Sequence, residues 1–292
     1  MQDQLYLSWQ FDPVLIGSLL AAAVAYFAAV GPLRSRIAPE ARFPFGRAAL
    51  FVSALMLTYL TEGSPLHDLS ERYLFSAHMV QHLLINYICA PLLIWGLPIW
   101  LLRHVMLSKR MMPVTKLITN PVFAALSFAL FLSLWHIPAI YDAGLRNSTI
   151  HHTQHVFFMI ISFVGWWPIM NPLKELPRLG YGAQIVYLFI VSNVLQLPLF
   201  AVVTFANEPF YASYRNAPRV AALEPLVNGV FTAQMDQQLA GVIMKVLAFV
   251  FYAIPIAFIF TRWYKDSRNP SFLPKVPKPD ISEPEPEGVP QT

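Results

Sequence analysis

Long apolar stretches alternate with short polar connections along the chain, and this pattern predicts helices that cross a membrane. A helix needs about 20 apolar residues to span the roughly 30 Å hydrocarbon layer of a bilayer, and the stretches have this length or fall a few residues short. They lack the period-two alternation of transmembrane β-barrel strands. We therefore predict an all-α membrane protein, a seven-transmembrane-helix bundle. Its predicted spans are residues 13–30, 48–60, 73–102, 121–137, 150–170, 183–206 and 233–263.

The composition supports a membrane protein and argues against a soluble enzyme. Hydrophobic residues make up 56% of the 292 positions and charged residues only 12%, whereas soluble domains carry about 25% charged residues. The single cysteine, Cys89, excludes an internal disulfide and a metal cage built from several cysteines. The sequence has no phosphate-binding loop, dinucleotide fingerprint or basic nucleic-acid-binding face. We therefore expect neither an enzyme nor a nucleic-acid-binding protein.

Basic residues are distributed unevenly between the two sides of the predicted bundle. Of the 20 Lys and Arg, 15 fall after the first, third and fifth spans and in the C-terminal segment, whereas four fall on the opposite side. Because cytoplasmic loops carry the excess of Lys and Arg, we predict an outside N-terminus and a cytoplasmic C-terminus. The transmembrane domain is predicted at residues 1–265. Residues 266–292, rich in proline and charge, are predicted to form a disordered cytoplasmic tail.

The histidines carry the candidate chemistry. His78 and His82 in HMVQH are four residues apart, as are His151 and His155 in HHTQH, so each pair lies on one face of its helix. In the predicted topology both pairs lie near the outer face, at the depth of His136 at the end of the fourth span. Imidazole is the commonest nitrogen ligand for copper, zinc, iron and nickel. These five histidines predict a metal or haem site.

Several polar neighbours are candidates to assist this site. His152 points about 100° away from its neighbour around the helix, and His67 lies on the same side in a predicted loop. Asp236, in the first turn of the seventh span, could bind the metal, hold a histidine N–H or simply stabilise the helix N-terminus. Tyr141 and Asp142 could orient ligands or form a turn.

Three methionines are weaker candidates. Met79, Met235 and Met244 carry thioethers, which bind Cu(I), although packing is the commoner role of methionine in a membrane helix. Lys245 lies deeper in the seventh span, without a partner that the sequence identifies. Of these three methionines, we predict that only Met244 lies beside the metal ligands.

At these positions the chain resembles a known family. HMVQHLL followed by APLLIWGLP, WHIPAIYDAGL, HHTQHVFF leading to GWWPI, and DQQLAGVIM are similar to the signatures of the CtaG family. These seven-helix membrane proteins take part in assembling caa-type cytochrome c oxidase. Gln154 stands where the family would have an acidic residue, and Lys245 where it would have an aromatic one. The functional residues implied by the resemblance are His78, His82, His136, His151, His155, Asp236 and Gln237.

The resemblance implies an assembly factor in the bacterial inner (plasma) membrane that binds copper, as Cu(I) or Cu(II), and delivers it from the outer face. Its expected partners are cytochrome c oxidase subunits, membrane lipid and an outer-side copper chaperone. Three alternatives stay open. Paired histidines also ligate b-type haem in electron carriers, a copper or proton transporter would use scattered polar residues in the spans, and a scaffold would bind no metal.

Overall fold

The computed structural model describes residues 7–218, 220 and 230–268. Within these ranges the chain forms helices and no strand, which confirms the all-α class. The helices are α1 (Pro13–Val30), α2 (Arg34–Ile37), α3 (Phe45–Glu62), α4 (Pro65–Arg72), α5 (Phe75–Leu84), η1 (Ile85–Cys89), α6 (Ala90–Gly96), α7 (Ile99–Met106), α8 (Met112–Ile118), α9 (Pro121–Trp135), α10 (Pro138–Arg146), α11 (Ser148–Met170), α12 (Tyr181–Phe189), η2 (Ile190–Leu195), α13 (Leu197–Phe205), α14 (Ala212–Arg215) and α16 (Ala233–Ser267).

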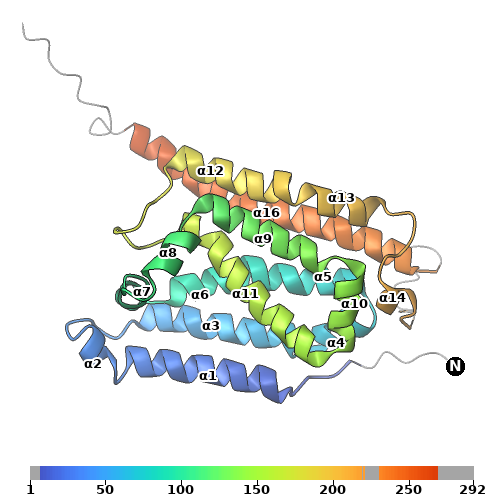
Figure 1. The fold of residues 1–292 in the computed structure, drawn as a ribbon, viewed down its shortest axis with the longest axis horizontal. Helices are drawn as coiled ribbons and strands as arrows, with labels where there is room; N and C mark the ends of the chain where they lie inside the picture. The colour runs from blue at the N-terminus through green and yellow to red at the C-terminus, as the bar shows by residue number, and fades with distance from the viewer. Residues whose placement is uncertain (1–6, 219, 221–229, 269–292) are drawn as a thin grey trace, which may run out of the picture.

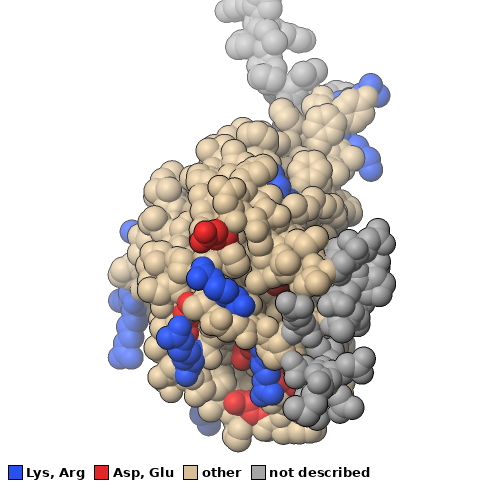
Figure 2. Space-filling view, turned by 90° about the vertical axis from the view of Figure 1, so that its right-hand side faces the viewer, with Lys and Arg blue, Asp and Glu red and all other residues tan. Residues whose placement is uncertain are grey.

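The long helices form an elongated bundle with two distinct ends (Figure 1). The N-terminal end of α1 lies at one end with α4, α10 and α14, whereas α2, α7, α8 and the C-terminal end of α16 lie at the other. We call the end with α4, α10 and α14 the histidine end, because the clustered histidines described below lie there. The surface of this end carries both basic and acidic side chains, so its charge is mixed (Figure 2).

Five helical segments are long and apolar enough to cross a membrane. They are Pro13–Val30, Phe75–Gly96, Ser148–Met170, Tyr181–Phe205 and Ala233–Ser267. Two bent pairs raise the count to seven if each pair is one span: α3 with α4, bent by 46°, and α8 with α9, bent by 75°. The described part of the chain is thus a multi-pass helical protein with five to seven spans. The number seven and the orientation of the termini stay predictions.

Each of these two bends lies where a new helix, α4 or α9, begins with its own N-terminal cap. Ser64 caps α4 by accepting a hydrogen bond from the Leu66 amide at 3.2 Å, and Asn120 caps α9 in the same way. A proline follows each cap, at the first position of the helix, where its missing N–H costs nothing. Both bends lie just outside the two shortest predicted spans: one follows residues 48–60, and the other precedes residues 121–137.

The predicted third span, residues 73–102, is wrong at its inner end. The continuous segment ends at Gly96, and α7 begins after Pro98. Pro91 follows the π-helical turn η1, as Pro198 follows η2, because a proline cannot donate the usual helical hydrogen bond and its ring displaces the preceding carbonyls. The last helix, α16, runs to Ser267, so the first two residues of the predicted tail are helical and not disordered; residues 269–292 of the predicted tail lie outside the described residues.

The core of the bundle is the segment α5–η1–α6, which packs against α3, α11 and α16. Close approach requires glycine at two contacts: a Cβ on Gly96 would lie 2.8 Å from the Phe51 backbone, and one on Gly241 would lie 2.9 Å from the Thr204 amide. By contrast α1 packs mainly against α3 and leaves most of its apolar side chains exposed, as suits contact with lipid. The fold therefore surrounds the two histidine-bearing helices, α5 and α11, with other elements.

Candidate metal centre

Helices α5 and α11 bring four histidines into one buried group, the histidine cluster: His78, His82, His151 and His155. The two rings of each helix lie 4.3 Å apart between centroids. Across the two helices the rings of His82 and His155 lie 5.3 Å apart, and those of His78 and His155 lie 6.3 Å apart. The two i, i+4 pairs read from the sequence thus meet in space.

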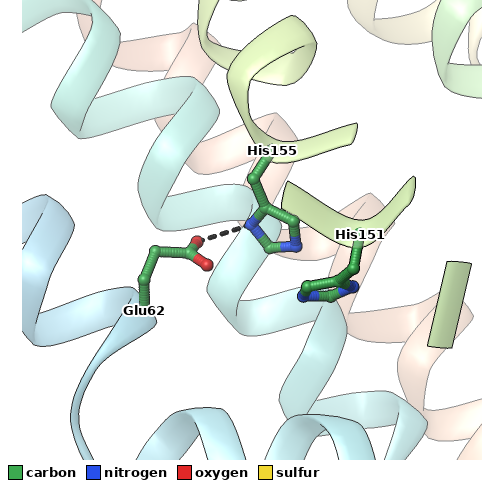
Figure 3. Close-up of side chains that lie close together, drawn as sticks. All are labelled: Glu62, His151 and His155. Carbon is green, nitrogen blue, oxygen red and sulfur yellow. Dashed lines mark ion pairs between the residues drawn. The ribbon is translucent and has the colours of Figure 1, made fainter. Parts of the chain in front are cut away.

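Two glutamates join the histidine cluster. Glu62 is the last residue of α3, and its Oε1 lies 2.7 Å from His155 Nδ1 (Figure 3). Glu71 on α4 contacts His151 Nε2 and lies 3.2 Å from His67 Nε2. The bend after α3 is what turns α4 back toward α11. Neither glutamate was among the residues that we predicted.

Two groups of ligand atoms lie close enough to share one metal ion each. Glu62, His151 and His155 form one triad, and His67, Glu71 and His151 form the other, with all ligand atoms of a triad within 4.8 Å of one another. His151 belongs to both. His67 lies within helix α4, not in the loop that we predicted, and its i, i+4 spacing to Glu71 is the sequence signal that points to the second triad.

The imidazole nitrogens of the cluster are buried and have no hydrogen-bond partner among the described residues. This holds for both nitrogens of all four cluster histidines and for Nε2 of His136. Each such group costs about 1–3 kcal/mol when it is buried without a partner. The carboxylates lie at contact distance but outside hydrogen-bonding geometry, and Oε1 of Glu62 and Oε1 of Glu71 also lack hydrogen-bond partners. Converging lone pairs of this kind match the donor set of a metal ion.

His136, at the C-terminal end of α9, is held apart from the triads in a fixed orientation. Its Nδ1 lies 2.7 Å from the Leu132 carbonyl oxygen, so Nδ1 carries the proton and Nε2 keeps its lone pair. With His82 it lines a small cavity, which Met244 also lines. His136 and the cluster histidine His82 thus line the same cavity, which adjoins the cluster.

Tyrosines cover the cluster at the histidine end. The ring of Tyr141 on α10 lies 5.2 Å from that of His78, and its hydroxyl pairs with the Tyr214 hydroxyl at 3.0 Å. Tyr214 in turn donates to the Ser70 carbonyl oxygen at 2.6 Å, and Tyr211 donates to the His136 carbonyl oxygen at 3.1 Å. Burial raises the pKa of all three phenols, which therefore stay protonated.

Asp236 and Gln237 lie outside both triads. The carboxylate of Asp236 accepts the amides of Phe75 and Ser76 at 2.6 and 3.1 Å, which satisfies the N-terminus of α5. Gln237 accepts the Phe210 amide at 2.7 Å and ties α16 to the segment after α13. The structure thus gives Asp236 a capping contact, but with the start of α5 instead of its own helix.

The other predicted neighbours also make contacts away from the metal ligands. Asp142 accepts the amides of Ala212 and Ser213, each at 3.1 Å, and so fixes α14. His152 Nε2 lies 3.3 Å from Asp12, the residue that caps α1. These two residues position the ends of helices. The ring of His152 also lies 6.3 Å from that of His151, somewhat farther than the 5.2 Å between Tyr141 and His78.

A cleft of about 460 Å³ leads from the cluster to the side of the bundle. Its polar end contains Glu62, His151 and His155. Most of the remainder is lined by apolar side chains of α1, α3, α6 and α11, among them Ala22 and Phe163, with further polar residues such as Asp12, His67 and His152. The cleft therefore borders one candidate metal triad, formed by Glu62, His151 and His155.

Comparison with known proteins places most of the chain in one group. The model of the cytochrome c oxidase caa3 assembly factor family (Caa3_CtaG) matches residues 24–266. Uncharacterized proteins of Mycobacterium bovis and Mycobacterium tuberculosis are each 22% identical over 279 residues, and one of Mycobacterium leprae is 21% identical. Each match covers 89% of this chain but only 40% of the relative, so the chain spans about two fifths of their length. No solved structure matches the chain.

Proposed function

Because the chain belongs to the cytochrome c oxidase caa3 assembly factor family, we propose that it binds copper at the histidine cluster and passes the ion to an oxidase subunit. The observation that carries this proposal is the set of buried imidazole nitrogens without hydrogen-bond partners beside two carboxylates. Imidazole and carboxylate ligands suit divalent first-row metals, among which Cu²⁺ binds most tightly, and imidazole also suits Cu(I).

The arrangement favours a site from which copper can leave. The cluster with its glutamates and His67 offers more ligands than one ion uses, and His151 is shared by two triads. An ion can therefore exchange one ligand for another without a stage in which it has few partners. The lateral cleft gives a ligand of a membrane-embedded partner a route to Glu62 and His155.

The proposed setting is the bacterial plasma membrane, with the histidine end outside. Copper would come from an outer-side chaperone and go to an oxidase subunit in the same membrane. This setting depends on the predicted orientation, in which 15 of 20 basic residues are cytoplasmic or lie at the cytoplasmic ends of spans.

The alternatives of haem binding and transport fit the site less well. A haem brings four nitrogen ligands of its own and needs no carboxylate beside its histidines, whereas two glutamates contact this cluster. A transporter needs a continuous polar path, but the ionisable group deeper in the seventh span, Lys245, is paired with Asn193 at 2.7 Å.

The test is the metal and haem content of the purified protein in detergent. We expect copper after loading, no Soret absorption band, and loss of most copper in His78→Ala/His82→Ala. His104→Ala is the matched control, since His104 is exposed on α7 at the other end of the bundle. Glu62→Gln, which keeps the shape of the side chain, tests the site without opening a cavity. A protein that takes up no copper, or that loses equal amounts in all variants, overturns the proposal.

A further inference from the structure

A small enclosed cavity adjoins the histidine cluster on the side of His82. Its volume is about 20 Å³, room for one water molecule or one ion. Its walls include Met79 and His82 of α5, His136 and Met244. Met79 and Met244 are 1% and 3% exposed, so both sulfurs lie in the interior of the bundle.

The walls of the cavity present soft and neutral ligands. His136 directs a free Nε2 lone pair because its Nδ1 is held by Leu132, and both nitrogens of His82 have no partner among the described residues. Met79 and Met244 add thioether sulfurs, which select Cu(I) over divalent ions. No carboxylate lines the cavity. A doubly charged ion would be costly in such apolar surroundings, whereas a singly charged one costs less.

We propose that this cavity is a second copper station, selective for Cu(I), with Met79, His82, His136 and Met244 as its ligands. The inference rests on the proposed function, which it deepens by assigning an oxidation state and a position to part of the bound copper. The triads with glutamate and the cavity with methionine then form two stations of different chemistry within one protein.

His82 connects the two stations. Its ring lies 5.3 Å from that of His155, whose Nδ1 contacts Glu62, and it also lines the cavity. A Cu(I) ion bound through His155 and His82 reaches the cavity when His155 leaves and Met79, Met244 and His136 take its place. This step exchanges ligands and moves no electron, so it needs no reductant within the protein.

The cavity has one further buried polar group without a partner. Nε2 of Gln196 has no hydrogen-bond partner among the described residues, while its Oε1 lies 3.4 Å from the Tyr87 hydroxyl. A single water molecule on Gln196 and His136 is therefore the competing occupant. Copper and water make different demands on the methionines, because water needs no sulfur.

The test is Cu(I) binding by anaerobic competition with a chromophoric Cu(I) chelator, on the full chain in detergent. Met79→Leu/Met244→Leu keeps nearly the same side-chain volume. We expect it to lose one bound Cu(I) equivalent and the sulfur contribution to the copper X-ray absorption spectrum. The control is Met235→Leu, on the same helix as Met244 but 38% exposed and outside the cavity; it should bind as the parent protein does.

The outcomes separate this inference from the proposed function. Copper bound through nitrogen and oxygen only, with unchanged stoichiometry in the double variant, overturns the second station and leaves the cavity to water. A protein that binds no copper in either oxidation state overturns both. The single variants Met79→Leu and Met244→Leu guard against misfolding of the double variant, and each should weaken the tightest Cu(I) binding by tenfold or more.

Discussion

The segments α5–η1 and α11 bury polar groups both in the middle of the bundle and in the histidine cluster. The two sets differ in their hydrogen bonds. Asn86 accepts a hydrogen bond from the Ser162 hydroxyl, and its backbone oxygen accepts the Trp166 indole N–H at 2.8 Å. In the cluster, about one to three turns away along α5 and α11, both nitrogens of every histidine lack a hydrogen-bond partner within the described chain. These contacts hold Asn86 within the fold, whereas the cluster has ligand capacity to spare.

This difference distinguishes buried polar groups that stabilise the fold from those that we propose bind a ligand. In a membrane interior, buried polar groups must be paired or they destabilise the fold. A fold that pairs Asn86 and Lys245 can also pair a histidine, as it does for Nδ1 of His136. Unpaired nitrogens that converge on two carboxylates therefore support the cation site that we propose, and the following changes test this proposal.

The largest effect is expected for His151→Ala compared with His152→Ala. His151 is the only residue in both triads, so its loss should lower the copper content to about a tenth or less, in line with the 10- to 100-fold effects seen around metal sites. His152 points toward Asp12 instead, and its variant should keep nearly all copper. Elemental analysis after loading and dialysis measures both; equal losses would remove the special role of His151.

Opposite effects on stability are expected for one substitution in each region, in copper-free protein. Ser162→Ala leaves the buried Asn86 side chain without its donor and should lower the free energy of unfolding by about 1–3 kcal/mol. His78→Leu removes two unpaired nitrogens at a site that is 1% exposed and should leave stability unchanged or raise it by about 1 kcal/mol. Thermal unfolding in detergent measures both variants. Destabilisation of similar size by His78→Leu would mean that the cluster is already paired without metal.

The sequence was informative where the chemistry is local. The i, i+4 pairs predicted His78 with His82 and His151 with His155, and residues 13–30 and 150–170 of the predicted spans agree closely with α1 and α11. The glutamates were missed because each reaches α11 from another helix, Glu62 from the end of α3 and Glu71 from α4, which begins after a bend of 46°. Asp236 was predicted as a possible ligand because its actual partners could not be seen in the sequence. They are the first amides of α5, about 160 residues away along the chain.

A smaller effect, on delivery alone, is expected from narrowing the lateral cleft. Ala22→Trp on α1 places a large ring in the apolar part of the cleft, at a distance from the metal ligands. The purified variant should bind as much copper as the parent protein, while the oxidase matured in cells that carry it should contain less copper and show lower activity. The control Val24→Trp alters a lipid-exposed position on the same helix. Normal maturation with both variants would show that copper does not leave through the cleft.

The smallest effect is expected at the contact between Asp12, which caps α1, and His152 on α11, outside both regions. Burial acts to raise the pKa of Asp12, but hydrogen bonds from the amides of Leu15 and Val14 and the neighbouring His152 lower it overall. A lowered carboxyl pKa stabilises the folded state above the unfolded value of about 4, and this contribution is lost as the pH falls through the lowered value. Asp12→Ala should therefore cost about 1 kcal/mol at pH 7, the usual worth of a helix cap, and progressively less below pH 4. Asp12→Asn keeps the cap and should cost less than Asp12→Ala at pH 7. Thermal unfolding of the three proteins at pH 7 and pH 3 measures this, and a difference between parent and Asp12→Ala that grows on acidification would contradict it.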